Sequence, residues 1–177
     1  MRKVTAFFIL CALLTGVASA GAAPSAPRLG LEVGISPQAG VLFAGAPDLG
    51  WSGVSMEGVL TWSEGMLHLE AGLEPGQSPI GWQVLAPVRA GARLVLPPFT
   101  LEALAEAAPG VALFRQAPLF MIGVGALGRG VWNLGPHFGV FVTLGARWTT
   151  SPAYAGYAGI AYSTLDVLIA IGARLGL

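Results

Sequence analysis

The stretch LDVLIAIGARLGL, residues 165–177, carries the pattern that decides the fold. Every odd position is apolar, whereas the even positions include Asp166, Gly172 and Arg174. A period of two is typical of a β-strand, because successive side chains point to opposite faces of a sheet. A helix would distribute Asp166 and Arg174 around its circumference. The stretch therefore predicts a strand with one apolar face and one face that accepts charge.

The first twenty residues have the composition of a secretory signal peptide. Arg2 and Lys3 give a positive start, residues 7–14 form an apolar centre, and residues 18–20 supply the small side chains of a cleavage site. Cys11 lies in the apolar centre, so the rest of the chain has no cysteine for a disulfide or a thiolate metal site. We therefore expect a signal peptide over residues 1–20.

The remaining chain is apolar overall but has no long apolar run. Hydrophobic residues make up 54% of the sequence and the mean hydropathy is +0.70, which is high for a soluble domain. After residue 20, charges, prolines or glycine clusters interrupt every apolar stretch before it is long enough for a spanning helix. Alternating strands reconcile these observations, because each strand of a membrane barrel needs only one apolar face. Removing Arg2 and Lys3 from the nine basic residues leaves seven against nine acidic ones, so no basic surface for nucleic acid is expected.

Alternation recurs along the chain and predicts an all-β fold, an antiparallel up-and-down transmembrane β-barrel. Polar stretches at residues 36–50 and 74–81 are interpreted as loops. Phe99–Phe114 fits one strand, a hairpin that turns at residues 109–110, or a capped helical turn, which leaves eight to ten strands. After a flexible leader over residues 21–27, a single barrel domain is expected over residues 28–177. Its predicted strands are residues 29–35, 51–62, 66–73, 82–96, 99–114, 119–131, 136–149, 154–162 and 165–177.

Charged residues in these strands have apolar neighbours. An arginine that faces lipid near the membrane midplane costs about 2–4 kcal/mol, so the charged side of each strand is expected to face the lumen. Glutamates and arginines nearly balance, which predicts paired charges in a narrow interior; a small polar pore or a proton path is the alternative. Glycines on this side, including Gly172, would relieve crowding. The predicted lumen residues are Glu32, Glu57, Glu70, Glu102, Glu106, Arg89, Arg93, Arg129, Arg147 and Arg174.

Aromatic residues lie at or near the ends of the predicted strands, and aliphatic residues and glycine occupy the strand centres. Amphipathic rings prefer the two membrane–water interfaces, so this distribution predicts a girdle at each end of the barrel. The predicted interface aromatics are Trp51, Trp62, Trp82, Trp132, Trp148, Tyr154 and Tyr162.

Catalysis and metal binding are not expected. A nucleophilic site needs a serine, a histidine and an orienting acid in reach of one another. The two histidines are His68 and His137; Phe138 and Gly139 follow His137, so the His-x-Ser arrangement of lipid A deacylase barrels is absent. His68 faces the same side as Glu70, which favours a hydrogen bond in the lumen. Two separated histidines without clustered carboxylates make a poor metal site, so neither a metal nor a cofactor is predicted.

These features together resemble those of the small bacterial outer-membrane β-barrels. The resemblance covers the signal peptide, the alternating strands, the aromatic strand ends and the terminal strand, although such barrels commonly end in an aromatic residue and this chain ends in Leu177. It implies a protein exported to the bacterial outer membrane, a monomer whose partners are membrane lipid and the barrel-insertion machinery, with no nucleic acid.

The sequence is compatible with three functions. The first is a barrel without catalytic activity that has a structural or surface role and a lumen filled by charge pairs. The second is a porin-like channel or transport barrel for a small solute or ion. The third is a secreted, soluble, lipocalin-like barrel that binds an apolar ligand, which requires the charged side to face outward and the apolar side inward.

Overall fold

The structure is a computed structural model that describes residues 28–44, 46–78, 81–114, 117–151 and 162–177. The predicted signal peptide and leader lie outside the described residues. So does the predicted strand at residues 154–162 apart from its last residue, and with it Tyr154.

Nine β-strands account for most of the described residues, and all of their pairings are antiparallel. No helix in the described ranges is long and apolar enough to cross a membrane. The strands are β1 (Arg28–Ala44), β2 (Ala46–Glu64), β3 (Leu67–Ser78), β4 (Gly81–Leu85), β5 (Val88–Leu96), β6 (Phe99–Phe114), β7 (Ala117–Asn133), β8 (Phe138–Ser151) and β9 (Tyr162–Gly176).

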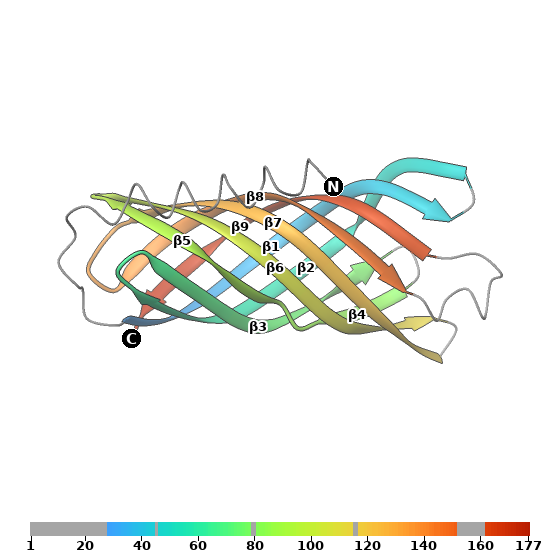
Figure 1. The fold of residues 1–177 in the computed structure, drawn as a ribbon, viewed down its shortest axis with the longest axis horizontal. Helices are drawn as coiled ribbons and strands as arrows, with labels where there is room; N and C mark the ends of the chain where they lie inside the picture. The colour runs from blue at the N-terminus through green and yellow to red at the C-terminus, as the bar shows by residue number, and fades with distance from the viewer. Residues whose placement is uncertain (1–27, 45, 79–80, 115–116, 152–161) are drawn as a thin grey trace, which may run out of the picture.

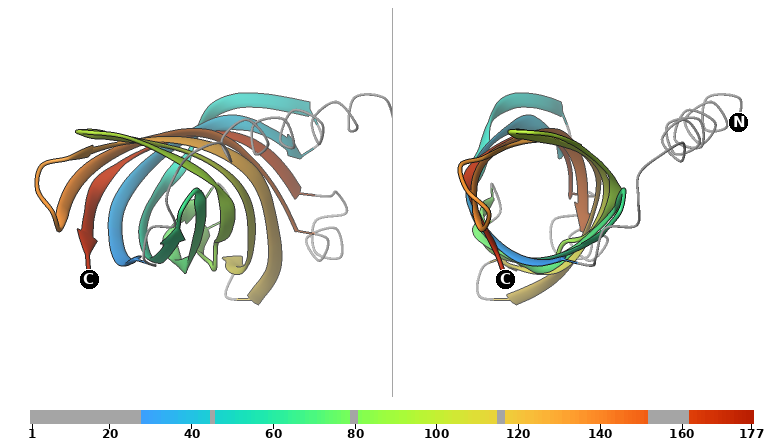
Figure 2. Two further views of the ribbon diagram at one scale, coloured as in Figure 1. Left: turned by 60° about the vertical axis from the view of Figure 1, so that its left-hand side comes forward. Right: turned by 90° about the vertical axis from the view of Figure 1, so that its left-hand side faces the viewer.

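The strands close into a barrel. β9 pairs with β1, and β2 pairs with β3, which joins the two ends of the sheet. β4 and β5 both pair with β3 on one side and β6 on the other, so they lie end to end and share one position. The described strands therefore occupy eight positions around the barrel, within the predicted range of eight to ten. The strands run obliquely to the long axis (Figure 1), and the view along that axis shows a closed ring (Figure 2).

The interruption between β4 and β5 falls at Ala86 and Pro87. Proline has no N–H to donate to a neighbouring strand. Its carbonyl still accepts a hydrogen bond from Gly72 N at 3.1 Å, and Ala86 N donates to Pro109 O at 2.7 Å. The strand predicted at residues 82–96 is therefore broken in the middle without losing its place in the barrel.

Phe99–Phe114 forms a single strand, β6. It pairs with β7 without interruption from Phe99 opposite Trp132 to Phe114 opposite Ala117. Pro109 lies within this ladder, opposite Ile122, so the chain makes neither a hairpin nor a helical turn there. The strand was one of the three interpretations left open by the sequence.

The two predicted polar loops are wrong. Residues 36–44 belong to β1 and residues 46–50 to β2, which form a long hairpin, and residues 74–78 continue β3, whereas residues 45, 79 and 80 lie outside the described residues. Gln38 Nε2 donates hydrogen bonds to Ser55 Oγ at 2.9 Å and to Glu74 Oε1 at 3.1 Å, and all three side chains are buried. Polar residues here do not mark a loop, because the interior of this barrel is itself polar.

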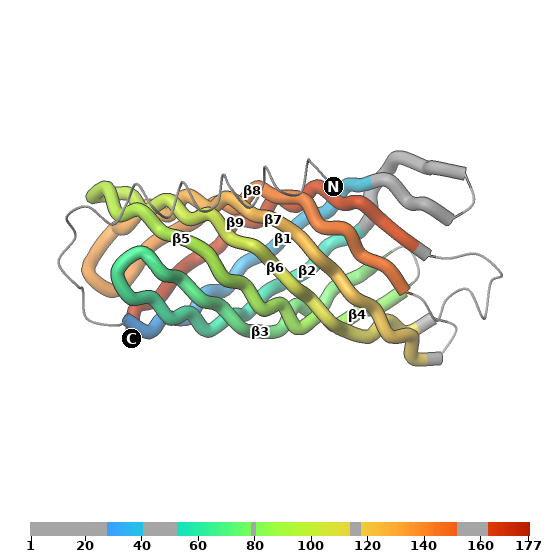
Figure 3. Tube along the Cα trace, in the orientation of Figure 1, coloured from blue at the N-terminus to red at the C-terminus, as the bar shows by residue number. Residues whose placement is uncertain are grey.

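Inward and outward side chains alternate strictly along most of the described strands, which the trace in Figure 3 follows around the barrel. In β6, Thr100, Glu102, Leu104 and Glu106 are buried, whereas the residues between them are exposed. The outward positions are mainly large apolar side chains such as Leu101, Leu144 and Val167, about half exposed or more. The barrel is thus polar inside and apolar outside, the reverse of a soluble fold.

Part of the lumen is nevertheless apolar. Leu85, Ala108, Ala112 and Met121 form a fully buried cluster between β4, β6 and β7. These residues lie toward the end of the β6–β7 ladder at Phe114 and Ala117, at the barrel end opposite the C-terminus. The cluster is called the apolar plug, because its fully buried apolar side chains occupy this part of the interior.

The Phe141 side chain needs the space left by two glycines, Gly172 in the neighbouring strand β9 and Gly34 in β1, the next strand along. Its ring projects inward from β8, and a Cβ built on Gly172 would lie 2.5 Å from the ring, or on Gly34 3.1 Å from it. Gly172 lies directly opposite both Phe141 and Gly34 in the ladder. The sequence-based expectation that Gly172 relieves crowding inside the barrel agrees with this contact.

Replacing Gly172 by alanine should therefore destabilise the barrel. Overpacking a well-packed interior costs about 1–3 kcal/mol, and here the new methyl group also meets the backbone carbonyl of Val33 at 2.2 Å. Gly128→Ala is the matched control, because Gly128 faces outward and its added Cβ would have its nearest neighbour at 3.9 Å. Urea unfolding of both variants in detergent measures the difference. Equal unfolding midpoints would contradict the contact between Gly172 and Phe141.

Candidate functional site

A network of charged side chains fills the lumen beside the apolar plug. Every one of the eight barrel positions contributes at least one member. All members are at most 6% exposed except Arg174, whose side chain is 15% exposed. This set is called the lumen ion network, and it comprises Glu32, Glu57, His68, Glu70, Glu74, Arg89, Glu102, Glu106, Arg129, Arg147 and Arg174.

Arg129 on β7 is one centre of the network. Its Nη1 donates to Glu32 and Glu70 and lies 3.6 Å from Glu102 Oε2. Its Nε donates to Thr143 Oγ1 at 2.9 Å, and the guanidinium carbon lies 4.8 Å from the centroid of the Phe141 ring. The face of the Phe141 ring therefore makes a cation–π contact with the guanidinium, and carboxylates from three other strands surround it.

Arg89 and Arg147 share Glu106. Arg89 donates from Nε to Glu106 Oε2 at 2.7 Å and from its Nη atoms to Glu57 at 2.7 Å and Glu70 at 3.0 Å. Arg147 donates from Nε to Glu106 Oε1 at 2.6 Å, and its Nη atoms form a two-point contact with Glu74 at 2.9 and 2.6 Å. The planar forks of the two guanidinium groups thus bind four carboxylates between them.

Arg174 joins the closing strand to two others. It lies opposite Glu32 in the ladder between β9 and β1 and donates to that carboxylate. Its Nη2 also donates to Glu102 Oε2 at 2.7 Å, across the lumen on β6. Arg174 therefore links the junction of β9 and β1 to β6 on the other side of the lumen.

Because these charges are buried, the stability of the barrel depends on each ion pair. A charge removed from water is tolerated only when partners replace its hydration, and removing one partner of a buried pair typically costs about 3–5 kcal/mol. The network provides that replacement by sharing every arginine among several glutamates. Its members hold one another in place, so the interior is a packed ionic core.

Nine of the ten predicted lumen residues belong to the network. Arg93 does not: it is half-buried at the barrel end that holds the C-terminus, where its Nε donates to Gly65 O at 2.9 Å. Glu74 was missed, because it was assigned to a loop. The signal was present in the sequence, since Glu74 continues the alternation of His68, Glu70 and Gly72.

Apart from Phe141, whose ring lies in the lumen, the described aromatic side chains lie toward the two barrel ends and face outward. Trp62 and Trp132 are near the end that holds the C-terminus, where the Trp132 ring stacks on Phe99 with centroids 6.3 Å apart. Trp82 and Trp148 are near the opposite end and are more than half exposed. Trp51 and Tyr162 belong to β2 and β9, but the described side chains do not include theirs.

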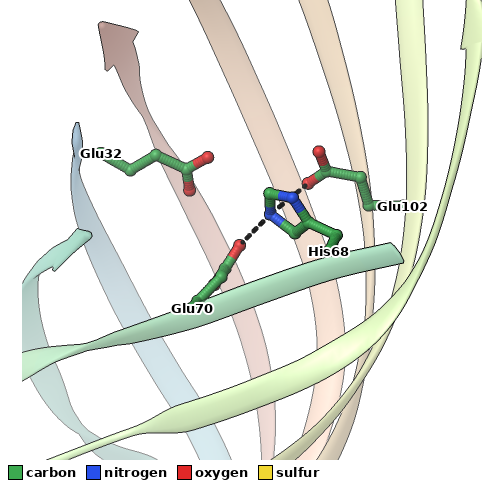
Figure 4. A group of neighbouring side chains, drawn as sticks. All are labelled: Glu32, His68, Glu70 and Glu102. Atoms are coloured by element: carbon green, nitrogen blue, oxygen red, sulfur yellow. Dashed lines mark hydrogen bonds and ion pairs between the residues drawn. The ribbon is translucent and has the colours of Figure 1, made fainter. Parts of the chain in front are cut away.

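His68 lies among carboxylates, contrary to the expectation that no carboxylates cluster around a histidine. Its Nε2 lies 2.9 Å from Glu70 Oε1 and 3.8 Å from Glu102 Oε2 (Figure 4). One ligand atom from each of Glu32, His68, Glu70 and Glu102 lies within 4.8 Å of the others. Three strands far apart in sequence supply these residues, so no local sequence motif predicts the cluster. His137 is exposed, in the turn between β7 and β8.

Comparison with protein-family models finds no match, and comparison with curated protein sequences finds none either. Solved structures do match. The neisserial surface protein NspA aligns over 87% of this chain and 99% of its own, with a TM-score of 0.52 and 14% identity. A de novo designed transmembrane β-barrel aligns over 85% of this chain and 95% of its own, with a TM-score of 0.50 and 14% identity. The fold is that of the small outer-membrane β-barrels. At this identity the likeness concerns the fold alone.

Replacing Arg147 by methionine should be strongly destabilising. The change leaves Glu74 and Glu106 without their two-point partner, for an expected loss of about 3–5 kcal/mol in the free energy of unfolding. Arg93→Met removes the same charge at the barrel end and should cost about 1 kcal/mol, the usual worth of one hydrogen bond. Urea titrations of the refolded proteins compare the two. Similar losses for both variants would show that the buried network is not what stabilises the barrel.

Proposed function

We propose that this protein is a bacterial outer-membrane β-barrel without catalytic activity, with a structural or surface role and a closed lumen. The observation that carries the proposal is the combination of an apolar exterior with an interior filled by the lumen ion network and the apolar plug. A surface role agrees with that of NspA, which is named as a surface protein.

The spacing of outward aromatic residues supports a membrane span. Phe120 and Trp132 both face outward on β7, near opposite ends of the barrel. Their separation is twelve residues. At about 3.4 Å per residue and a tilt of about 40°, that separation covers roughly 30 Å along the barrel axis. The apolar band of an outer-membrane barrel is about 25 Å tall, so the two rings would lie at its two interfaces.

The filled interior favours a closed barrel over a channel. Leu85, Ala108, Ala112 and Met121 are fully buried, and Arg129 and Arg147 are 2% exposed. A conducting pore needs water in contact with such groups. The same burial keeps His68 and the carboxylates away from any substrate, which supports the absence of catalysis. The lipocalin-like alternative requires the opposite orientation of the two sides of each strand.

Membrane lipid and the barrel-insertion machinery are the proposed partners, with the protein a monomer. The outward apolar side chains provide the surface for lipid. β9 closes the barrel against β1, and Leu177 N donates to Leu29 O at 2.9 Å at the end of this seam.

Cell fractionation tests the membrane location. We expect the protein in the outer-membrane fraction, resistant to extraction with carbonate, and with a gel mobility that changes on boiling because the folded barrel resists detergent. The apolar exterior is the reason for both results. Recovery in the soluble fraction without a mobility shift would contradict the proposal.

Planar-bilayer recording tests the closed lumen. The folded protein, inserted at single-molecule density, should give no stepwise conductance, whereas an open porin recorded in the same bilayer should. Burial of the apolar plug and the network is the physical reason. Reproducible steps that depend on this protein would favour the transport alternative instead.

A further inference from the structure

The lumen ion network carries more negative than positive charge. It contains six glutamates, Glu32, Glu57, Glu70, Glu74, Glu102 and Glu106, and four arginines, Arg89, Arg129, Arg147 and Arg174. With a neutral His68, six negative and four positive charges leave a formal charge of minus two. A buried group of charges tolerates such an excess poorly, because water is not there to screen it. One divalent cation would cancel the excess.

Three buried atoms of the network form no hydrogen bond among the described residues. They are Nδ1 of His68, Oε1 of Glu57 and Oε1 of Glu102, of which the last is ion-paired with Arg174 Nη1 at 2.7 Å. His68 is 1% exposed, and its other ring nitrogen faces the carboxylates of Glu70 and Glu102. Because nothing bonded to Nδ1 fixes the tautomer, the proton of a neutral imidazole can lie on Nδ1, which leaves the lone pair of Nε2, facing the carboxylates, for a ligand.

We propose that Glu32, His68, Glu70 and Glu102 form a binding site for one divalent first-row transition-metal ion of the Zn²⁺ or Co²⁺ type. Their ligand atoms lie within 4.8 Å of one another. Ligand atoms about 2.0–2.2 Å from a tetrahedral ion are about 3.3–3.6 Å apart, so the widest pair of the cluster contracts by about 1.2–1.5 Å when the ion binds. An imidazole nitrogen beside carboxylate oxygens selects these ions over Ca²⁺ and Mg²⁺, which prefer oxygen alone.

The Arg129 guanidinium marks the position of the ion. Its Nη1 contacts Glu32 and Glu70 and lies 3.6 Å from Glu102, so this point already accepts a positive charge. Arg129 Nη2 is 3.9 Å from the unpartnered Oε1 of Glu57. On metal binding, the guanidinium moves toward Glu57, and Glu32 keeps its contact with Arg174. The free oxygen of Glu57 thereby gains a donor.

The test uses the whole chain without an affinity tag, refolded into detergent micelles in the presence of Zn²⁺ or Co²⁺ because the lumen is sealed in the folded barrel. We expect one equivalent of metal per folded chain after exhaustive dialysis, and for Co²⁺ the visible absorption of inner-sphere ligands. X-ray absorption at the zinc edge should show one imidazole nitrogen. His68→Gln should weaken binding by at least about tenfold, since even outer partners of a metal matter by that factor.

Two matched controls make the result specific. Glu102→Gln and Glu106→Gln remove the same charge from the same strand, but only Glu102 is a proposed ligand, so only Glu102→Gln should lose the metal. His137→Gln removes the other histidine of the chain and should leave binding unchanged. Wild-type protein that retains no metal, or that holds it without an imidazole ligand, would overturn the proposal, as would equal losses in both glutamine variants. The visible and X-ray absorption of the wild-type protein test for the imidazole ligand even if His68→Gln does not fold.

Discussion

Pairing of buried charges is the constraint on which the rest of the structure depends. Four arginines and six glutamates lie in the lumen, all of them buried except Arg174, whose side chain is 15% exposed, and each guanidinium binds at least two carboxylates. Partners come from all eight positions of the barrel, so the pairs form only when every strand is in register. A shift of one residue would turn Arg147 outward and leave Glu74 and Glu106 unpaired. The network thus specifies the register as well as filling the lumen.

The exterior follows from the same alternation. When every second residue faces the charged interior, the residues between them form an apolar surface, with Trp132 and Phe99 near one end and Trp82 and Trp148 near the other. Water cannot cover such a surface at low cost, whereas lipid can. A polar core and an apolar exterior are therefore two results of one sequence period. The polar core and the apolar exterior also explain why a filled lumen and a membrane location are proposed together.

The sequence predicts the barrel, its alternation and nine of the ten assigned lumen residues, because a period of two is a local property that any one strand displays. It does not predict the distances between strands. Glu74 was assigned to a loop because proline and glycine follow it, although its carboxylate binds Arg147 from across the lumen. His68 and Glu102 lie on strands that are not neighbours, so their proximity depends on the curvature of the closed sheet. Arg93 has the lumen parity but lies too near the barrel end to join the network.

Cysteine labelling along β7 tests the inside-out arrangement most directly. Single cysteines replace Val124 or Gly128, which face outward, and Leu127 or Val131, which are buried, in a chain whose Cys11 is changed to alanine. In the folded protein in lipid vesicles, the outward cysteines should react with a lipid-soluble maleimide and not with a charged, water-soluble one. The inward cysteines should react with neither until the barrel is unfolded. Labelling of the cysteine in Leu127→Cys or Val131→Cys by the water-soluble reagent would show an open, hydrated lumen and contradict the account.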